Sequence, residues 1–257
     1  MNEKIKVTSI ASSSKGNCYH VSCNNTEFLI DAGISAKGIC DGLRNIGTCI
    51  EKIQAIFITH EHIDHVKGLY VLTKKHHIPI HMTRRSADVF CQKNTELPDI
   101  VRHESVFTCA FGGVKVSSFF SSHDSADCVG YIVECENDRF GIATDTGYVD
   151  RVAVDALVGC STVVLESNYD EKMLLGGNYP PELKERIKSA TGHLSNYDCA
   201  AFARYLAENG TKRFMLGHLS EENNTPEIAF NITSRALKDF DDVIIKIAEP
   251  YNPTFLE

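Results

Sequence analysis

Short runs of apolar residues alternate with stretches of helical periodicity along most of the chain. In the first half, three apolar runs separated by tight turns predict successive strands, and helices then alternate with strands. The second half shows the same order, strands first and helices afterwards. We expect strands at residues 5–11, 18–23, 26–31, 53–58, 78–82, 114–120, 129–135, 139–144, 162–165, 213–216 and 243–248, and helices at 35–46, 64–77, 150–158, 181–190, 196–208 and 226–239.

This order of elements predicts an α/β fold of four layers, an αββα sandwich in which two sheets pack face to face with helices outside. No internal repeat or low-complexity linker interrupts the pattern, so we expect one domain over residues 1–257. The N-terminal Met-Asn-Glu-Lys-Ile-Lys-Val lacks the apolar segment of a secretory signal. No stretch approaches the roughly 18 apolar residues of a membrane span. We therefore expect a cytoplasmic protein without a membrane segment.

Charge and cysteine content narrow the function classes. The formal net charge of −8 argues against a broad basic surface for nucleic acid, although two bound divalent cations would halve it at one point. The ten cysteines include no CxxC pair, and their spacing is irregular. We therefore expect reduced cysteines that act as small apolar residues, rather than a disulfide framework or a zinc ribbon.

The strongest chemical signal is the stretch ITHEHIDHVKG, residues 58–68, directly after an apolar strand. It places His60, His62, Asp64 and His65 within six positions, which is too polar for a core. A loop can fold these side chains around metal, and their nitrogen and oxygen donors suit zinc and manganese alike. The alternatives are a solvated loop that is rich in histidine, or Asp64 as the N-cap of the next helix.

Three further metal-type residues each end an apolar strand. They are His123 in FSSHDS, Asp145 in GIATDTG and His218 in FMLGH. In sheets of this kind, ligand sites gather at the carboxyl ends of the strands. Alone, each residue could be a simple turn or capping residue, but together with the histidine cluster they predict a metal centre.

The pattern HxHxDH with a later His, Asp and His resembles the metallo-β-lactamase superfamily over essentially the whole chain. The resemblance implies an αββα sandwich of the metallo-β-lactamase type and two divalent metal ions, zinc or manganese. Asp145 would bridge the two ions, and Asp31 in FLIDAG would support the cluster from behind the ligands. Oxygen-reducing relatives have Glu in place of His62, so a hydrolytic site is favoured. The implied ligands are His60, His62 and His123 for one ion, and Asp64, His65 and His218 for the other.

A closer resemblance is to the YycJ/WalJ-type bacterial exonucleases of that superfamily. The sequence departs from their pattern at Ser13, where glycine is common, and at Tyr169, where histidine is common. The matching stretches are SIASSSKGNCY, LIDAG, THEHIDHVKGL, TDTG, LESNYD, YPPELKERI, GHLSN and LGHLSEENNTPE.

The resemblance implies a dinuclear metal-dependent phosphodiesterase that hydrolyses nucleic acid, with 5′-to-3′ DNA exonuclease action. A metal-bridging hydroxide would attack the phosphodiester, with Asp64 part of the catalytic centre as well as a ligand. No protein nucleophile is then needed, and the chain has no GxSxG motif. The alternatives are a thioesterase of the glyoxalase II type or a lactonase on the same site, and a non-catalytic metal-bound scaffold.

The letters GHLS occur twice, around His193 and His218, in unlike settings. Ser195 with Asp198 forms a capping-box-like start to the helix at 196–208, so His193 lies beside a helix N-terminus, a place suited to phosphate. We predict that His218 binds metal, while His193 contacts the scissile phosphate or protonates the leaving group. The alternative for His193 is a loop histidine that closes the helix start.

Weaker candidates for substrate contact lie in polar loops. Ser14 and Asn17 in SSSKGN could offer polar groups to a phosphate, although a plain β-turn would look much the same. Asn168, after the strand 162–165, is a further candidate. Lys67 could also meet a phosphate, and a solvated helix lysine is the simpler interpretation of it.

Overall fold

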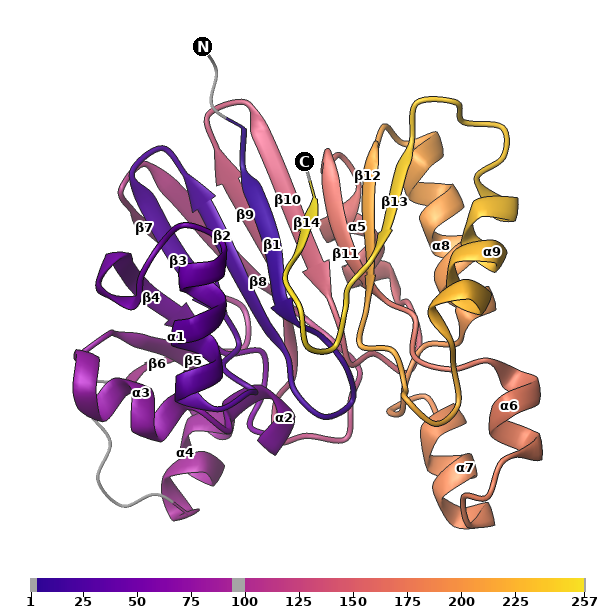
Figure 1. Ribbon diagram of the computed structural model, residues 1–257, viewed down its shortest axis with the longest axis horizontal. Helices are drawn as coiled ribbons and strands as arrows, with labels where there is room; N and C mark the ends of the chain where they lie inside the picture. The colour runs from indigo at the N-terminus through magenta and orange to yellow at the C-terminus, as the bar shows by residue number, and fades with distance from the viewer. Residues whose placement is uncertain (1–3, 94–99, 257) are drawn as a thin grey trace.

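The computed structural model describes residues 4–93 and 100–256. Within them, two seven-stranded sheets pack face to face, and helices cover both outer surfaces (Figure 1). This arrangement confirms the predicted αββα sandwich. In spatial order the first sheet contains β14 (Thr254–Leu256), β1 (Lys6–Ala11), β2 (Cys18–Cys23), β3 (Thr26–Ile30), β4 (Ile53–Phe57), β5 (Ile80–Thr83) and β6 (Ile100–His103). The second contains β13 (Ile244–Ile247), β12 (Arg213–Gly217), β11 (Thr162–Glu166), β10 (Asp138–Ala143), β9 (Val129–Cys135), β8 (Val114–Phe120) and β7 (Thr108–Phe111).

Helices accompany each sheet in chain order. The first half carries α1 (Ala36–Asn45), a short 3-10 helix (Ile50–Lys52), α2 (Ile63–Val66), α3 (Leu69–His76) and α4 (Arg84–Lys93). The second half carries α5 (Arg151–Leu157), α6 (Glu171–Gly176), α7 (Pro181–Lys188), α8 (Asn196–Glu208) and α9 (Pro226–Ala236). The helix start at Ser195 is as predicted, because its hydroxyl accepts a hydrogen bond from the Asp198 amide at 3.1 Å. None of the helices in the described ranges is long and apolar enough to cross a membrane.

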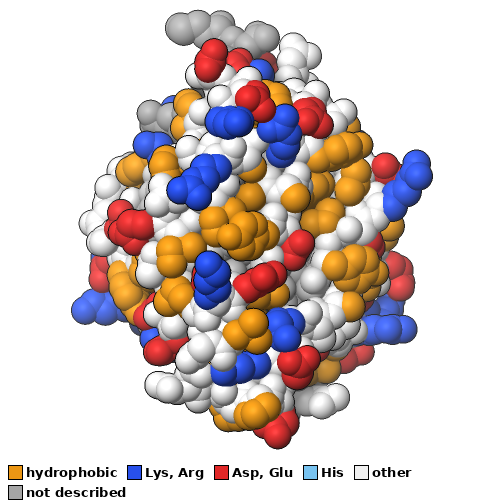
Figure 2. All heavy atoms as spheres, turned by 90° about the vertical axis from the view of Figure 1, so that its right-hand side faces the viewer, with side chains coloured by type: hydrophobic (Ala, Val, Ile, Leu, Met, Phe, Trp, Pro, Cys, Tyr) orange, Lys and Arg blue, Asp and Glu red, His pale blue; other side chains and the backbone are white. Residues whose placement is uncertain are grey.

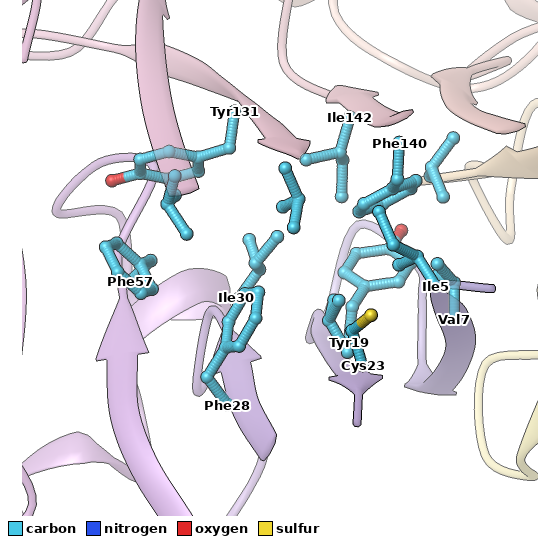
Figure 3. Close-up of a cluster of buried hydrophobic side chains, with 14 of the residues drawn as sticks. Ile5, Val7, Tyr19, Cys23, Phe28, Ile30, Phe57, Tyr131, Phe140 and Ile142 are labelled. Atoms are coloured by element: carbon cyan, nitrogen blue, oxygen red, sulfur yellow. The ribbon is translucent and has the colours of Figure 1, made fainter. Parts of the chain in front are cut away.

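The apolar core between the sheets draws side chains from both of them (Figure 3). Phe28 and Phe57 point inward from the first sheet, and Tyr131 and Phe140 from the second. The Phe57 and Tyr131 rings meet edge to face at 5.6 Å across the interface. All four rings are fully buried, and burial of each such side chain contributes about 1.5–3 kcal/mol. The apolar core therefore holds the two sheets together along their inner faces.

The predicted helix at 64–77 is interrupted and forms α2 and α3. The Gly68 amide donates a hydrogen bond to the carbonyl of Ala32 at 2.8 Å. A side chain at Gly68 would place its Cβ 2.3 Å from the Ile34 carbonyl oxygen, so this close approach requires glycine. The sequence prediction also missed the short elements β6, β7, β14, α4 and α6. In β6 and β7 much of the backbone lies at a sheet edge, where apolar alternation is weak.

The expectation that all the cysteines stay reduced is wrong for Cys23 and Cys135, which form a disulfide. Cys23 ends β2 in the first sheet, and Cys135 ends β9 in the second. The two residues are 112 positions apart, and only the packing of the sheets brings them together, so their spacing in the sequence does not reveal the pair. The other eight cysteines are free, as expected.

Candidate metal centre

The predicted metal-type residues lie at one edge of the sandwich, where strands of both sheets end. His60 follows β4 in the first sheet, while His123, Asp145 and His218 follow β8, β10 and β12 in the second. Asp145 and His218 have positive φ angles of 56° and 55°, as does Asp31 at 62° after β3. Left-handed backbone at a non-glycine residue costs of order 1–3 kcal/mol and persists only where the surroundings hold it. The chain accepts this cost at three strand ends that meet at one place.

One group of possible ligands consists of His60, His62 and His123, whose ligand atoms lie within 4.8 Å of one another. His123 Nδ1 donates a hydrogen bond to the Gly192 carbonyl at 3.0 Å, which leaves its Nε2 facing His62 Nδ1 at 3.3 Å. His60 Nε2 is buried and has no hydrogen-bond partner among the described residues. A buried imidazole nitrogen without a partner is unfavourable unless a cation occupies that place, so this group fits a metal ion.

A second group consists of Asp64, His65, Asp145 and His218. His65 Nε2 lies 3.3 Å from Asp64 Oδ2 and 3.1 Å from Asp145 Oδ2. His218 Nε2 lies 3.3 Å from Asp64 Oδ2 and 3.4 Å from Asp145 Oδ1. Asp145 Oδ1 is also 3.7 Å from His123 Nε2. Asp145 thus lies between the two groups, where a shared ligand would be.

Asp31 lies behind the second group. His65 Nδ1 donates a hydrogen bond to Asp31 Oδ2 at 2.7 Å, and the Thr59 amide donates one to Asp31 Oδ1 at 2.8 Å. Asp31 and His65 are both fully buried. Because the Nδ1 proton of His65 is held by Asp31, the Nε2 lone pair faces the other carboxylates. The carboxylate therefore sets the orientation of the imidazole.

Sequence reasoning missed Glu166, the buried last residue of β11. Its Oε1 accepts hydrogen bonds from His193 Nδ1 at 2.7 Å and from His218 Nδ1 at 3.0 Å. Its Oε2 accepts one from the Thr146 amide at 2.8 Å. The available signal was an acid that ends the apolar run Thr-Val-Val-Leu-Glu, as Asp145 follows the neighbouring strand. Glu166 joins the two GHLS segments through one carboxylate.

The buried carboxylates give the centre a strong attraction for positive charge. Burial alone lowers the pKa of His65, but its aspartate neighbours, Asp145 foremost, raise that pKa well above its usual range. The same opposition of burial and carboxylates raises the pKa of His218 to about 10. Burial and the neighbouring His65 lower the pKa of His60 well below its usual range. The carboxylates attract cations to one side of the centre, and His60 offers a neutral nitrogen. A metal ion binds deprotonated donors of both kinds.

His193 belongs to the same site and, with Asp145, Glu166 and His218, forms a third group of possible ligands. Its ring stacks on that of His218 with centroids 5.3 Å apart, and its side chain is 20% exposed. Its backbone amide donates a hydrogen bond to the Ile187 carbonyl at 2.8 Å, so the loop between α7 and α8 fixes its place. Because Nδ1 donates to Glu166, Nε2 remains for a ligand or a transferable proton.

The structure separates the three candidates for substrate contact. The Asn17 amide nitrogen is buried and lies 3.4 Å from His65 Nε2. Asn168 is also buried and donates to the His218 carbonyl at 2.8 Å, so its side chain positions that histidine. Ser14 is exposed at the surface of the loop between β1 and β2. Of the three, Ser14 is the residue that solvent reaches directly.

The two departures from the exonuclease pattern have internal contacts. Tyr169 is buried in a small apolar cluster with Leu174 and Ile187, beside α6 and α7. Ser13 is buried as well, and its carbonyl accepts a hydrogen bond from the Asn17 side chain at 2.9 Å. Both residues therefore shape the loops around the centre.

Comparison with known proteins adds a family and named relatives. The model of the Beta-lactamase superfamily domain matches residues 26–219. The chain is 33% identical over 234 residues to the exodeoxyribonuclease YycJ of Bacillus anthracis, and the aligned region covers 90% of this chain and 88% of the relative. It is 34% identical over 228 residues to the exodeoxyribonuclease WalJ of Streptococcus pneumoniae, and the aligned region covers 87% of this chain and 85% of the relative. The metallo-beta-lactamase fold protein YhfI from Bacillus subtilis superposes with a TM-score of 0.74 at 17% identity over 98% of each chain, which confirms the fold type.

Proposed function

We propose that this chain, which belongs to the beta-lactamase superfamily, is a metal-dependent nuclease that degrades DNA from the 5′ end. The observation that carries the proposal is the meeting of two ligand groups at Asp145, with His193 held beside them by Glu166. The exodeoxyribonuclease relatives, similar over most of both chains, support a nucleic acid substrate. The choice of DNA and the 5′-to-3′ direction are our extension of that similarity.

The residues at this edge fit two divalent metal ions. Imidazole and carboxylate donors accept zinc and manganese alike, so both ions suit the site. When bound, such ions supply a nucleophile at neutral pH and offset the negative charge of a phosphoryl group. One ion would be held by His60, His62 and His123, and the other by Asp64, His65 and His218, with Asp145 shared.

His193 would perform the proton transfer. Burial alone lowers the pKa of His193, but the Glu166 carboxylate raises it above its usual range. The imidazolium can therefore hold a proton on Nε2 at neutral pH and donate it to the leaving oxygen of the phosphodiester. His218 is unsuited to this step because its Nε2 faces Asp64 and Asp145.

The remaining predicted contacts receive different roles in this proposal. Ser14, exposed on its loop, would meet a substrate phosphate, while Asn17 and Asn168 would keep His65 and His218 in place. A cytoplasmic location and a single domain over residues 1–257 stay predictions from the sequence.

The proposal is tested by stripping the protein of metal and reconstituting it separately with zinc and manganese. Each form is offered 5′- and 3′-labelled single- and double-stranded DNA, RNA and a thioester. We expect stepwise release of nucleotides from the 5′ end of DNA, and no activity after chelation. Hydrolysis of the thioester alone would overturn the nuclease assignment and favour the thioesterase alternative.

The two GHLS histidines provide the matching variants. His218→Ala should lose metal, whereas His193→Ala should retain full metal content and lose about 10²–10⁴-fold in kcat. His76→Ala, at the end of α3, is the control and should match the wild type. Loss of metal from His193→Ala would contradict its role as a proton donor.

A further inference from the structure

A row of side chains leads away from the metal centre along α2 and α3. It begins at Ile63, which separates the candidate ligands His62 and Asp64 and is 70% exposed. Lys67 and Tyr70 follow four and seven positions later. Residues at this spacing share one face of a helix.

The break between α2 and α3 does not end this row. Lys67 and Gly68 both keep right-handed helical backbone angles, and the Lys67 amide donates to the Ile63 carbonyl at 2.9 Å. Right-handed backbone thus continues across the break, and Ile63, Lys67 and Tyr70 line one groove. Lys74 extends the row, with its ammonium 5.7 Å from the centroid of the Tyr70 ring.

Ile63, Lys67 and Tyr70 line a groove of about 110 Å³ beside the centre. Glu61 is the acidic residue of its wall, but both carboxylate oxygens are engaged. They accept hydrogen bonds from the Ala126 amide and from the Ser86 hydroxyl, each at 2.8 Å. Within the described part of the chain, Lys67 makes no ion pair or hydrogen bond through its ammonium. The groove therefore presents apolar surface, an aromatic ring, the Lys67 ammonium without an ion pair, and the hydrogen-bonded carboxylate of Glu61.

We propose that this groove binds the nucleotide adjoining the scissile phosphate of a single DNA strand. Its base would contact Tyr70 and the apolar wall at Ile63, and its phosphate would contact Lys67. Aromatic faces that alternate with cations are the general means of binding unpaired strands, because every base has a face that can stack. This inference rests on the proposed nuclease function.

Charges are mixed on another exposed face of the molecule (Figure 2). Figure 2 shows the side formed by the right-hand helices of Figure 1, where acidic and basic side chains are interspersed among apolar ones. On the α2–α3 row, by contrast, the two charged members, Lys67 and Lys74, are both basic. This row also begins at the ligands, so a strand on it would continue directly into the centre.

The test compares Lys67→Gln and Tyr70→Ala with Lys75→Gln, which lies on α3 but lines a different hollow, next to α1. The substrates are a single-stranded oligonucleotide and bis(p-nitrophenyl) phosphate, a phosphodiester without neighbouring nucleotides. We expect kcat/KM for the oligonucleotide to fall about tenfold in each groove variant. Hydrolysis of the small diester and metal content should stay at the wild-type level. Lys67→Gln should also reduce the slope of log KM against log salt concentration by about 0.7, the value for one phosphate of a single strand.

Oligonucleotides with one abasic site at successive positions give a second measurement. At the position that meets Tyr70, the abasic substrate should be cleaved more slowly by the wild type and without further loss by Tyr70→Ala. Equal behaviour of Lys67→Gln and Lys75→Gln on the oligonucleotide would overturn the groove assignment while leaving the nuclease function intact. Failure of the wild type to cleave DNA would overturn both.

Discussion

Replacing Glu166 by glutamine perturbs the hydrogen bonds that hold His193 and His218 at the centre. The amide preserves the size of the side chain, but only one of its two terminal atoms can accept hydrogen bonds. In the wild type Oε1 accepts from His193 and His218, and Oε2 accepts from the Thr146 amide. Whichever way the new amide turns, at least one buried donor loses its acceptor and both histidines lose a negative partner.

The size of the effect follows from these contacts. A hydrogen bond to a charged group contributes about 1.5–3 kcal/mol, and a buried donor left without an acceptor costs about 1–3 kcal/mol. We therefore expect the free energy of unfolding of the metal-free protein to fall by about 2–4 kcal/mol. Loss of a carboxylate that orients a ligand costs about 10–100-fold in metal affinity. The value of kcat should fall by more than the metal loss explains, because His193 also loses the group that raises its pKa.

The measurements are urea denaturation of the metal-free protein, metal titration against a competing chelator, and kcat on DNA at saturating metal. Glu134→Gln is the control, because this carboxylate pairs with Lys115 at 2.7 Å on the surface of the second sheet. Glu166→Gln with wild-type metal affinity and wild-type kcat would refute the reasoning. A loss confined to stability would show that Glu166 supports the fold without orienting either histidine.

Two further predictions concern parts of the molecule away from the candidate ligands. The Cys23–Cys135 disulfide closes a loop with a sequence separation of 112, so its reduction should lower the free energy of unfolding by up to about 4 kcal/mol. Urea denaturation with and without dithiothreitol measures this difference, and coincident curves would contradict it. Burial, followed by His103, lowers the pKa of His81 to about 4, so its contribution to stability is complete above pH 6.5 and disappears as the pH falls toward 4. Allowing for the partial exposure of His81, about 1–2 kcal/mol should be lost over that range, and His81→Gln should remove this part of the pH dependence.

The sequence predicts the framework well where burial imposes a clear pattern. β4, β11 and β12 appear as apolar runs because both of their faces are covered, and the polar residue after each run marks the edge of the sheet. The αββα order follows from these runs. The strands β6 and β7 are harder to predict, since they contain only partly buried and exposed residues.

The candidate site shows the same division between local and distant information. The ligand-type residues stand out because histidine and aspartate at strand ends have no place in a core. Glu166 does not, since a single acid after an apolar strand also suits a turn, and its partners His193 and His218 are 27 and 52 positions away. The Cys23–Cys135 pair is hidden for the same reason. Contacts made only by packing the sheets leave no local pattern.

The disulfide and the candidate ligands lie at opposite ends of the same strands. β2 begins next to Asn17, beside His65, and finishes at Cys23; β9 begins where the Val129 amide donates to the Thr59 carbonyl, and finishes at Cys135. The candidate ligands, like the cysteines, come from both sheets. A covalent link thus joins the sheets at one end, and bound metal would join them at the other. Because metal and substrate would meet at the same end of the sandwich, each should strengthen the binding of the other.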